Sequence, residues 1–303
     1  MRAIAYVASW VIWPALMGLG LFVLFTLDPE FCIPAVIIFG FSAFQFLSLV
    51  LLEQAMPVAR EWNLFGDPQK LSHIGHAAVS QAGAAAGVAI AVYLAQIAAA
   101  RLPMDAAIWP EAQPLATQIA AALIMYEFGA YWLHRAMHRL PALWPLHALH
   151  HAVERMNVLV TGRIHLFSTF LAKSLLLAPI YLLGAGDEVF ASVAAISLWS
   201  GNLSHANIRM RFPPGFVGIV TTNQTHHLHH DRDLALGNAN YGSTLLIFDR
   251  LFGTYVAPDV KPRADVGVAD DPVGRNFWLE LIAPAIWPYL MMRRRRTPKA
   301  AGK

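Results

Sequence analysis

The sequence predicts an all-α, polytopic integral membrane protein with about four to six membrane helices and a helical, histidine-rich cap on the cytoplasmic side. Three observations lead to this fold class. The 303 residues are 57% hydrophobic and only 14% charged, whereas soluble domains are about a quarter charged. Apolar runs recur with lengths near the roughly 20 residues that cross a bilayer. Thirteen histidines accompany a single cysteine, Cys32, which excludes an intramolecular disulfide framework.

Six apolar runs are the candidate membrane helices, at residues 3–27, 33–52, 77–100, 115–133, 166–183 and 189–203. The first is too long for a typical signal-peptide core and is expected to remain as an anchor. The last two are shorter and form a hairpin that either spans the bilayer or only enters it. A further segment, 277–292, contains Pro284 and Pro288 and is expected at the interface or re-entrant. All are expected to be helical, because a membrane segment must satisfy its backbone hydrogen bonds internally.

Positive charge predicts the orientation. With the N-terminus inside, the outer loops are 28–31, 100–114 and 184–188. Of the 22 Lys and Arg residues, only Arg101 lies in these loops, and only Lys173 lies within an apolar run. Cytoplasmic loops carry the excess of Lys and Arg, so the remaining segments face the cytoplasm. A bacterial inner membrane is favoured, or the endoplasmic reticulum if the source is eukaryotic.

The whole chain, 1–303, is expected to form one membrane-embedded domain. Its membrane helices lie mainly within 3–133 and 166–203, and its cap comprises 134–165 and 204–260. A basic tail at 293–303 is interpreted as a topology determinant at an anionic membrane surface. No nucleic-acid partner is expected.

Nine histidines fall into four spaced groups, all on the inner side. Spacings of three and four residues place imidazoles on one helical face, and closely packed imidazoles repel one another when protonated unless a metal binds them. Nine ligands suggest two metal ions with four or five each, although imidazole alone does not distinguish iron, zinc, copper and nickel. The candidate ligands are His134, His138, His147, His150, His151, His205, His226, His229 and His230.

The residues around these histidines form a recognisable pattern. Segment 131–151 reads YWLHRAMHRLPALWPLHALHH, segment 205–208 reads HANI, and segment 226–230 reads HHLHH. Segment 240–242 reads NYG, and segment 249–255 reads DRLFGTY. Over roughly residues 53–255 the sequence resembles the fatty acid hydroxylase/sterol desaturase superfamily.

The resemblance implies an oxidoreductase with two non-haem iron ions held by the nine histidines. It implies O2 as co-substrate and hydroxylation or desaturation of a membrane lipid, whether fatty acyl, sterol-like or isoprenoid. Because the sequence has no dedicated nucleotide-binding motif, the electrons are expected from a separate protein, cytochrome b5-like or ferredoxin-like with a reductase. Two alternatives stay open: an ether-lipid monooxygenase of the same superfamily, and a histidine-rich metal transporter or binding protein.

The sequence departs from the superfamily at one position. Related chains often carry a histidine four residues before the third-box histidine, where this sequence has Gly201. His165, Asn202, His227 or a water are candidates for a tenth ligand or for a supporting contact. Glu127 within an apolar run is a candidate for orienting a ligand imidazole, and Asp231 for accepting a hydrogen bond near the last pair.

Two further interpretations concern residues outside the ligand set. His73 and His76 are expected at the membrane interface and not to bind metal. Asp249 and Arg250 are expected to form a structural ion pair behind the site.

Overall fold

The computed structural model describes residues 2–26, 34–101, 108–260, 264–269 and 271–296. Within these residues the chain forms eleven α-helices and four short 3-10 helices, and the only β-type pairing is two isolated bridges, Val220 with Leu245 and Asp231 with Val266. The all-α prediction is confirmed for this part of the chain. The predicted outer loop at 28–31 and the side chains of the basic tail at 293–303 lie outside it.

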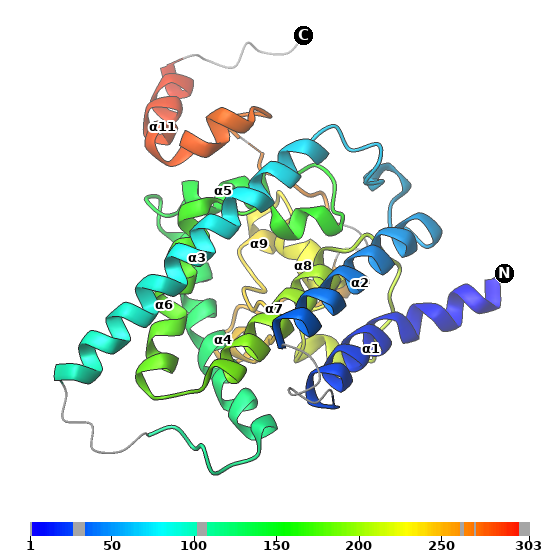
Figure 1. The fold of residues 1–303 in the computed structure, drawn as a ribbon. Helices are drawn as coiled ribbons and strands as arrows, with labels where there is room; N and C mark the ends of the chain where they lie inside the picture. The colour runs from blue at the N-terminus through cyan, green and yellow to red at the C-terminus, as the bar shows by residue number, and fades with distance from the viewer. Residues whose placement is uncertain (1, 27–33, 102–107, 261–263, 270, 297–303) are drawn as a thin grey trace, which may run out of the picture.

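The long helices follow the predicted apolar runs (Figure 1). They are α1 (Arg2–Thr26), α2 (Pro34–Ala55), α3 (Lys70–Arg101), α4 (Leu115–Arg139), α6 (Leu166–Leu182), α7 (Asp187–His205) and α11 (Phe277–Arg296). By length and composition, α1, α2 and α3 are able to cross a membrane, and α6 and most of α11 are shorter apolar helices.

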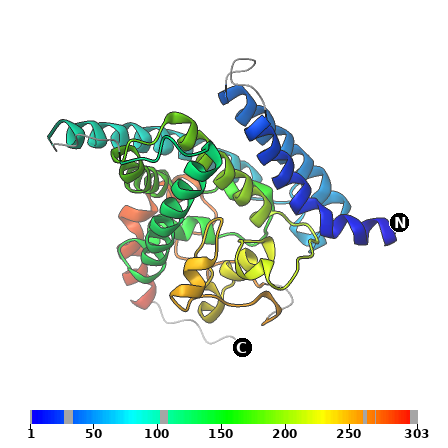
Figure 2. The ribbon, with the colours of Figure 1, turned by 90° about the horizontal axis from the view of Figure 1, so that it is seen from below.

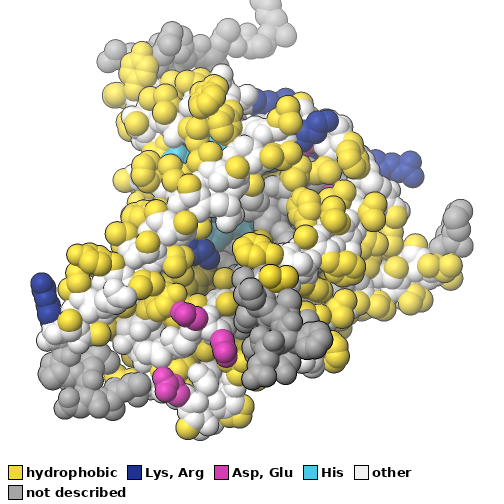
Figure 3. Space-filling model, viewed as in Figure 1, with side chains coloured by type: hydrophobic (Ala, Val, Ile, Leu, Met, Phe, Trp, Pro, Cys, Tyr) yellow, Lys and Arg dark blue, Asp and Glu magenta, His cyan; other side chains and the backbone are white. Residues whose placement is uncertain are grey.

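The surface agrees with a membrane protein. Phe39, Leu51 and Leu71 expose more than 70% of their surface, which is costly in water for large apolar side chains. Figure 3 shows hydrophobic side chains distributed over the helices on one face of the molecule, with the visible acidic side chains gathered at its lower end. Exposed apolar patches of this extent are typical of a lipid-facing surface.

Helices α3 and α6 lie side by side because α3 presents glycines to its neighbour. A Cβ on Gly83 would lie 2.3 Å from the carbonyl oxygen of Leu166, and a Cβ on Gly87 would lie 2.6 Å from that of Phe170. Both distances are shorter than real Cβ contacts, so any larger residue would push the helices apart. Small residues allow this close backbone approach between membrane helices.

Helix α7 occupies the centre of the bundle and contacts α1, α2, α4 and the cap. Its Trp199 is fully buried and packs edge-on against Phe41 of α2, with ring centroids 4.7 Å apart. Viewed from below, α1 and α2 form one side of the molecule, and α3 with α6 lies on the other side of α7 (Figure 2).

The short helices gather at one end of the bundle and form the cap. They are α5 (Trp144–His151), α8 (Asn223–His229), α9 (Leu234–Gly237) and α10 (Ile247–Leu251), with 3-10 turns at Arg60–Trp62, Val158–Gly162, Phe216–Gly218 and Pro258–Val260. Glu53, near the end of α2, accepts hydrogen bonds from the backbone N–H groups of Val158 (2.8 Å) and Asn207 (2.9 Å). This buried carboxylate therefore joins a membrane helix to two segments of the cap.

The predicted ion pair between Asp249 and Arg250 is wrong. The Asp249 carboxylate accepts hydrogen bonds from the N–H groups of Tyr241 and Gly242 and from the Thr254 hydroxyl. Arg250 instead donates to the Gly218 carbonyl at 2.6 Å and lies over the Tyr255 ring. Adjacent helical residues point about 100° apart, so the two side chains reach different neighbours.

Candidate metal centre

Two helices joined by a tight connection deliver five histidines. Helix α4 continues past its apolar part and carries His134 and His138 in its last two turns. Pro141 follows the end of α4, and Pro145 stands in the first turn of α5, where a missing N–H is tolerated. Helix α5 is therefore free to fold back against α4, with His147, His150 and His151 on its buried side.

The other four histidines come from α7 and α8. His205 is the last residue of α7. Helix α8 begins with a capping box in which Thr222 and Thr225 satisfy each other's backbone N–H groups, an arrangement that fixes the start of a helix. His226 and His229 lie on this helix, and His230 forms its C-cap.

The nine histidines separate into two groups. The five-histidine group contains His134, His138, His147, His151 and His229, and the four-histidine group contains His150, His205, His226 and His230. In each group one nitrogen per residue lies within 4.8 Å of all the others. Each adjacent pair, 150–151 and 229–230, contributes one member to each group, because neighbours on a helix point about 100° apart.

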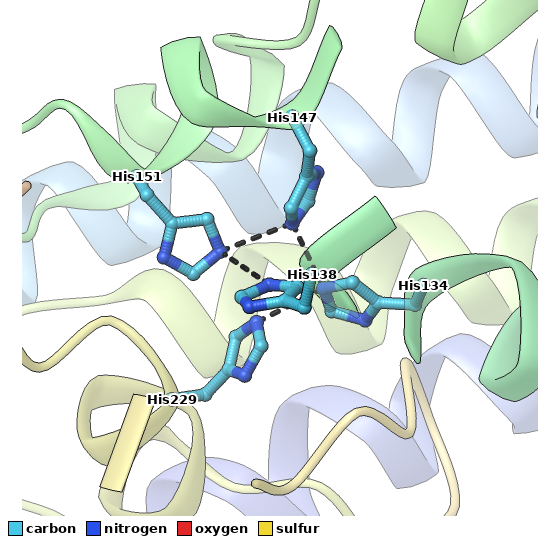
Figure 4. Close-up of side chains that lie close together, drawn as sticks. All are labelled: His134, His138, His147, His151 and His229. Atoms are coloured by element: carbon cyan, nitrogen blue, oxygen red, sulfur yellow. Dashed lines mark hydrogen bonds between the residues drawn. The ribbon is translucent and has the colours of Figure 1, made fainter. Parts of the chain in front are cut away.

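Within the five-histidine group the Nε2 atoms converge on a common centre (Figure 4). Nε2 of His134 lies 2.9 Å from Nε2 of His147 and 2.9 Å from Nε2 of His229. Nε2 of His151 lies 3.0 Å from that of His147 and 3.1 Å from that of His138. Side chains from α4, α5 and α8 thus meet at one point.

The four-histidine group repeats this arrangement. Nε2 of His205 lies 3.2 Å from Nε2 of His150 and 3.0 Å from Nε2 of His226. Nε2 of His230 lies 3.2 Å from that of His226. The two groups adjoin, because the rings of His151 and His230 stack with centroids 4.3 Å apart.

Backbone carbonyl groups that lie beside Nδ1 define the tautomers of four of the histidines. Nδ1 of His134 lies 2.7 Å from the carbonyl oxygen of Tyr241, and Nδ1 of His229 lies 2.7 Å from that of Ala239. The Gly201 and Arg163 carbonyls hold His205 and His150 in the same way, at 2.8 and 3.2 Å. A carbonyl oxygen only accepts, so Nδ1 carries the hydrogen and Nε2 presents a lone pair. Nε2 lone pairs that face each other at about 3 Å repel, and a metal ion bound between them removes that repulsion.

Burial keeps these imidazoles neutral. It lowers the pKa of His134 to about 4. For His147 and His151, burial together with the neighbouring imidazoles holds the pKa well below the ordinary value of 6.5. A neutral imidazole is the form that binds a metal, so the nine side chains are prepared as ligands near neutral pH.

Comparison with known proteins places this arrangement in a family. The sequence profile described as fatty acid hydroxylase matches residues 119–254. An ornithine lipid hydroxylase of Rhizobium tropici is 35% identical over 240 residues, which cover 78% of this chain and 72% of that relative. The chain belongs to the fatty acid hydroxylase family. The predicted resemblance and the oxidoreductase class are thereby confirmed.

Other members of the family match over shorter stretches. An alkylglycerol monooxygenase of Danio rerio is 30% identical over 172 residues, 57% of this chain and 37% of the relative. A fatty acid hydroxylase of Lecanicillium sp is 27% identical over 154 residues, 46% of this chain and 42% of the relative. The chain therefore spans less than half the length of these two proteins. No solved structure matches the chain.

Glu127 contacts the loop that lies beside His134. Its Oε2 accepts hydrogen bonds from the backbone N–H groups of Ser243, Thr244 and Leu245 at 2.9 to 3.1 Å. These residues follow Tyr241, whose carbonyl oxygen faces His134. We propose that Glu127 acts on His134 through this loop, because its carboxyl group does not contact the imidazole directly.

Four candidates do not belong to either histidine group, and their side chains contact other residues. They are His165, Asn202, His227 and Asp231. His165 caps α6, accepting from Phe167 N–H through Nδ1, and its Nε2 donates to the Leu281 carbonyl at 3.0 Å. Asn202 donates to Gln45 of α2. His227 packs on Trp62 and lies 3.4 Å from the His205 carbonyl oxygen. The Asp231 carboxylate accepts from the N–H groups of Asp233 and Asp265.

A buried network beside the centre was not predicted. Arg163 is fully buried, donates to the Glu280 carboxylate at 2.6 Å and to the Leu149 carbonyl at 3.1 Å, and offers its own carbonyl to His150. His76 contacts the other oxygen of Glu280 at 2.9 Å. His73 and His76, which the sequence places at the membrane interface, are both fully buried and belong to neither histidine group. Glu280 is 117 residues from Arg163 and 204 residues from His76, so these contacts gave no local signal in the sequence.

Proposed function

We propose that the two histidine groups hold two iron ions and that the enzyme uses O2 to hydroxylate a membrane lipid. Family membership supports the lipid oxidoreductase, and the convergence of nine histidines in two groups supports the metal assignment. Family membership also favours the enzyme over a metal transporter. We infer that residues 1–303 act as one domain, because the cap histidines come from α4, α5, α7 and α8 together.

The spacing of the nearest ligand atoms fits nitrogens that bind one shared ion. Two nitrogens about 2.1 Å from one ion are about 3.0 Å apart at a right angle and about 3.4 Å apart at the tetrahedral angle. The Nε2 pairs lie 2.9 to 3.2 Å apart, close to the right-angle value.

The chemistry requires a redox-active metal. In hydroxylation, a C–H bond and O2 with two electrons and two protons give C–O–H and one water. Bound iron would supply the oxidising power for an unactivated C–H bond, which redox-silent zinc lacks. The residues of the chain contribute by fixing the imidazole tautomers, by burying the centre from bulk water, and by placing it at the end of membrane helices.

The lipid is expected to enter from the membrane. The face in Figure 3 is hollowed near its centre, and a histidine side chain is visible within the hollow. Hydroxylation is favoured over desaturation because several of the matched relatives, including the ornithine lipid hydroxylase, are hydroxylases or monooxygenases. The matches to alkylglycerol monooxygenases make an ether lipid the second candidate substrate.

We place the cap on the cytoplasmic side, where the loops rich in Lys and Arg are expected. The two electrons would then come from a cytochrome b5-like protein or from a ferredoxin-like protein with its reductase.

Metal analysis and lipid analysis together test the function. Purified full-length protein is expected to contain about two irons per chain. Membranes of cells that express it under 18O2 should contain a lipid with one added 18O atom. Cells that express the His151→Ala variant are the control and should lack that lipid. An unchanged lipid composition, or full activity in an iron-free protein, would contradict the proposal.

A further inference from the structure

A row of aromatic rings runs from the five-histidine group to the surface of the molecule. The ring centroid of Tyr241 lies 5.3 Å from that of His138. The Tyr131 ring lies 6.0 Å from Tyr241, and the Trp132 ring lies 5.3 Å from Tyr131. Tyr131 and Tyr241 are fully buried, whereas Trp132 exposes 42% of its surface. The row therefore joins a buried histidine to the surface through three side chains that can each lose one electron.

The hydrogen bonds of Tyr131 distinguish this row from ordinary aromatic packing, which uses similar ring contacts. The Thr254 hydroxyl donates to the buried Asp249 carboxylate at 2.7 Å. Because this hydroxyl has only one hydrogen, it accepts from the Tyr131 hydroxyl at 3.0 Å. Arg135 donates to the Tyr131 oxygen at 2.8 Å. The phenol proton of Tyr131 thus points along two hydrogen bonds that end on a carboxylate.

This chain of acceptors suits Tyr131 to one-electron oxidation. Loss of one electron makes a phenol a strong acid, so the electron leaves readily only where the proton also has an acceptor. Tyr126 on the same helix lacks this arrangement, since its hydroxyl lies 3.5 Å from the Lys173 ammonium, which only donates. A row that served only as a bridge for incoming electrons would not need the acceptor, because its tyrosines would never be oxidised.

We propose that Tyr131 is a one-electron donor that acts through Tyr241 on the five-histidine group when O2 is consumed without lipid. The inference rests on the proposed two-iron function. Reduction of O2 to two waters takes four electrons, and four protons from the solvent. Two electrons come from the external donor protein, and without a C–H bond to oxidise, two more are needed.

Tyr131 supplies these two electrons one at a time. With each electron its proton passes to the Thr254 hydroxyl, which gives its own proton to Asp249, and Tyr131 becomes a neutral radical. Trp132 then returns an electron to this radical while the proton returns from Asp249 by the same route. A reductant in the medium, such as a thiol, restores Trp132 at the surface. The row therefore spares the ligand histidines from oxidation.

Freeze-quench electron paramagnetic resonance tests this assignment. Full-length, iron-loaded, reduced protein is mixed with O2 in the absence of a lipid substrate, and O2 uptake is followed in parallel. Wild-type protein should form a tyrosyl radical, recognised by the change in its spectrum when the tyrosine rings are deuterated. Tyr131→Phe keeps the ring and should lower the radical yield by about tenfold or more. Tyr126→Phe is the matched control and should form the radical like the wild type.

Two variants at Thr254 separate the proton chain from the packing of the rings. Thr254→Val removes the hydroxyl between Tyr131 and Asp249, whereas Thr254→Ser keeps it. The radical yield should fall in Thr254→Val and be retained in Thr254→Ser. Trp132→Phe should lengthen the lifetime of the radical, because the ring that returns the electron to Tyr131 is replaced by one that is much harder to oxidise.

Oxidation of the ligands provides a second readout. After O2 uptake without lipid, peptide mass spectrometry should find more oxidised histidine in the five-histidine group of Tyr131→Phe than in the wild type. A tyrosyl radical of wild-type yield in Tyr131→Phe, equal losses in the two Thr254 variants, or no O2 uptake by iron-loaded protein without lipid would overturn the inference. Protein that binds no iron would instead contradict the proposed function, so the two failures are distinguishable.

Discussion

The carbonyl oxygen of Tyr241 lies 2.7 Å from Nδ1 of His134, a residue 107 positions earlier in the chain. This contact fixes the His134 tautomer and directs its Nε2 toward the other imidazoles of the five-histidine group. The loop that carries the carbonyl is itself held from two sides, by Glu127 of α4 and by Asp249 of α10. Acceptors that orient ligand imidazoles usually matter for metal affinity.

Removing the Asp249 carboxylate should loosen this loop. Asp249→Ala deletes the acceptor of the Tyr241 and Gly242 N–H groups, so the carbonyl that orients His134 is less well held. We expect a roughly 10- to 100-fold loss of iron affinity, selective for the five-histidine group, as measured by chelator competition. Asp265→Ala, with an exposed side chain beside Arg232, is the control and should retain iron. Equal affinity in both variants would contradict this role of Asp249.

Neutralising Glu280 should detach the C-terminal helix α11. Glu280→Gln breaks the buried contacts with Arg163 and His76 and leaves the Arg163 charge without its partner. Loss of one partner from a buried pair costs about 3 kcal/mol or more of the free energy of unfolding. We expect faster proteolysis within residues 264–296. Glu154→Gln breaks a half-exposed ion pair with Arg275 and should change stability by about 0.5 kcal/mol or less. A Glu280 variant as resistant as wild type would argue against this anchor.

Two buried histidines should respond differently to the same substitution. His150→Ala removes an Nε2 ligand atom from the four-histidine group and should lower iron content toward one per chain and abolish turnover. His227→Ala removes an equally buried imidazole that packs on Trp62 outside both groups, so stability should fall and iron content should not. Metal analysis of both variants separates these outcomes. Iron loss from His227→Ala would mean that the ligand set is wrong.

Acid should release the metal and destabilise the fold. Burial lowers the pKa of His134 from 6.5 to about 4. Between these values the unfolded chain takes up a proton that the folded chain does not, so the free energy of unfolding falls as pH falls. Protons also compete with the metal for Nε2. Iron content and melting temperature are expected to be constant above pH 7 and to decline from about pH 6.5 toward pH 4. Constant values down to pH 4.5 would contradict this account.

The long helices were predictable because their signal is local. The apolar runs 115–133, 166–183 and 189–203 correspond to α4, α6 and α7 within a few residues, except that α4 continues to Arg139. The histidines were predictable as candidates for the same reason, since their spacing lies within single helices. The sequence also contains a signal for their division into two groups. Histidines 150 and 151 are adjacent, as are 229 and 230, and adjacent residues on a helix point about 100° apart.

The supporting contacts were not predictable because they join distant segments. Arg163 and Glu280 are 117 residues apart, and the Tyr241 carbonyl has no side-chain signature at all. His165 is an example of a residue whose contact the sequence did not indicate. It was a candidate tenth ligand because it lies near a family motif, whereas its side chain donates to the Leu281 carbonyl of α11. Residue type and spacing indicated the candidate ligands, whereas tertiary packing alone determines which backbone atoms lie beside them.

The most direct test of the two-iron centre is Mössbauer spectroscopy of 57Fe-loaded full-length protein, combined with iron quantification. The nine-histidine arrangement predicts about two irons per chain in two unequal, nitrogen-rich environments, and His205→Ala should remove only one of the two signals. A single iron site, or an active protein that holds zinc in place of iron, would contradict it.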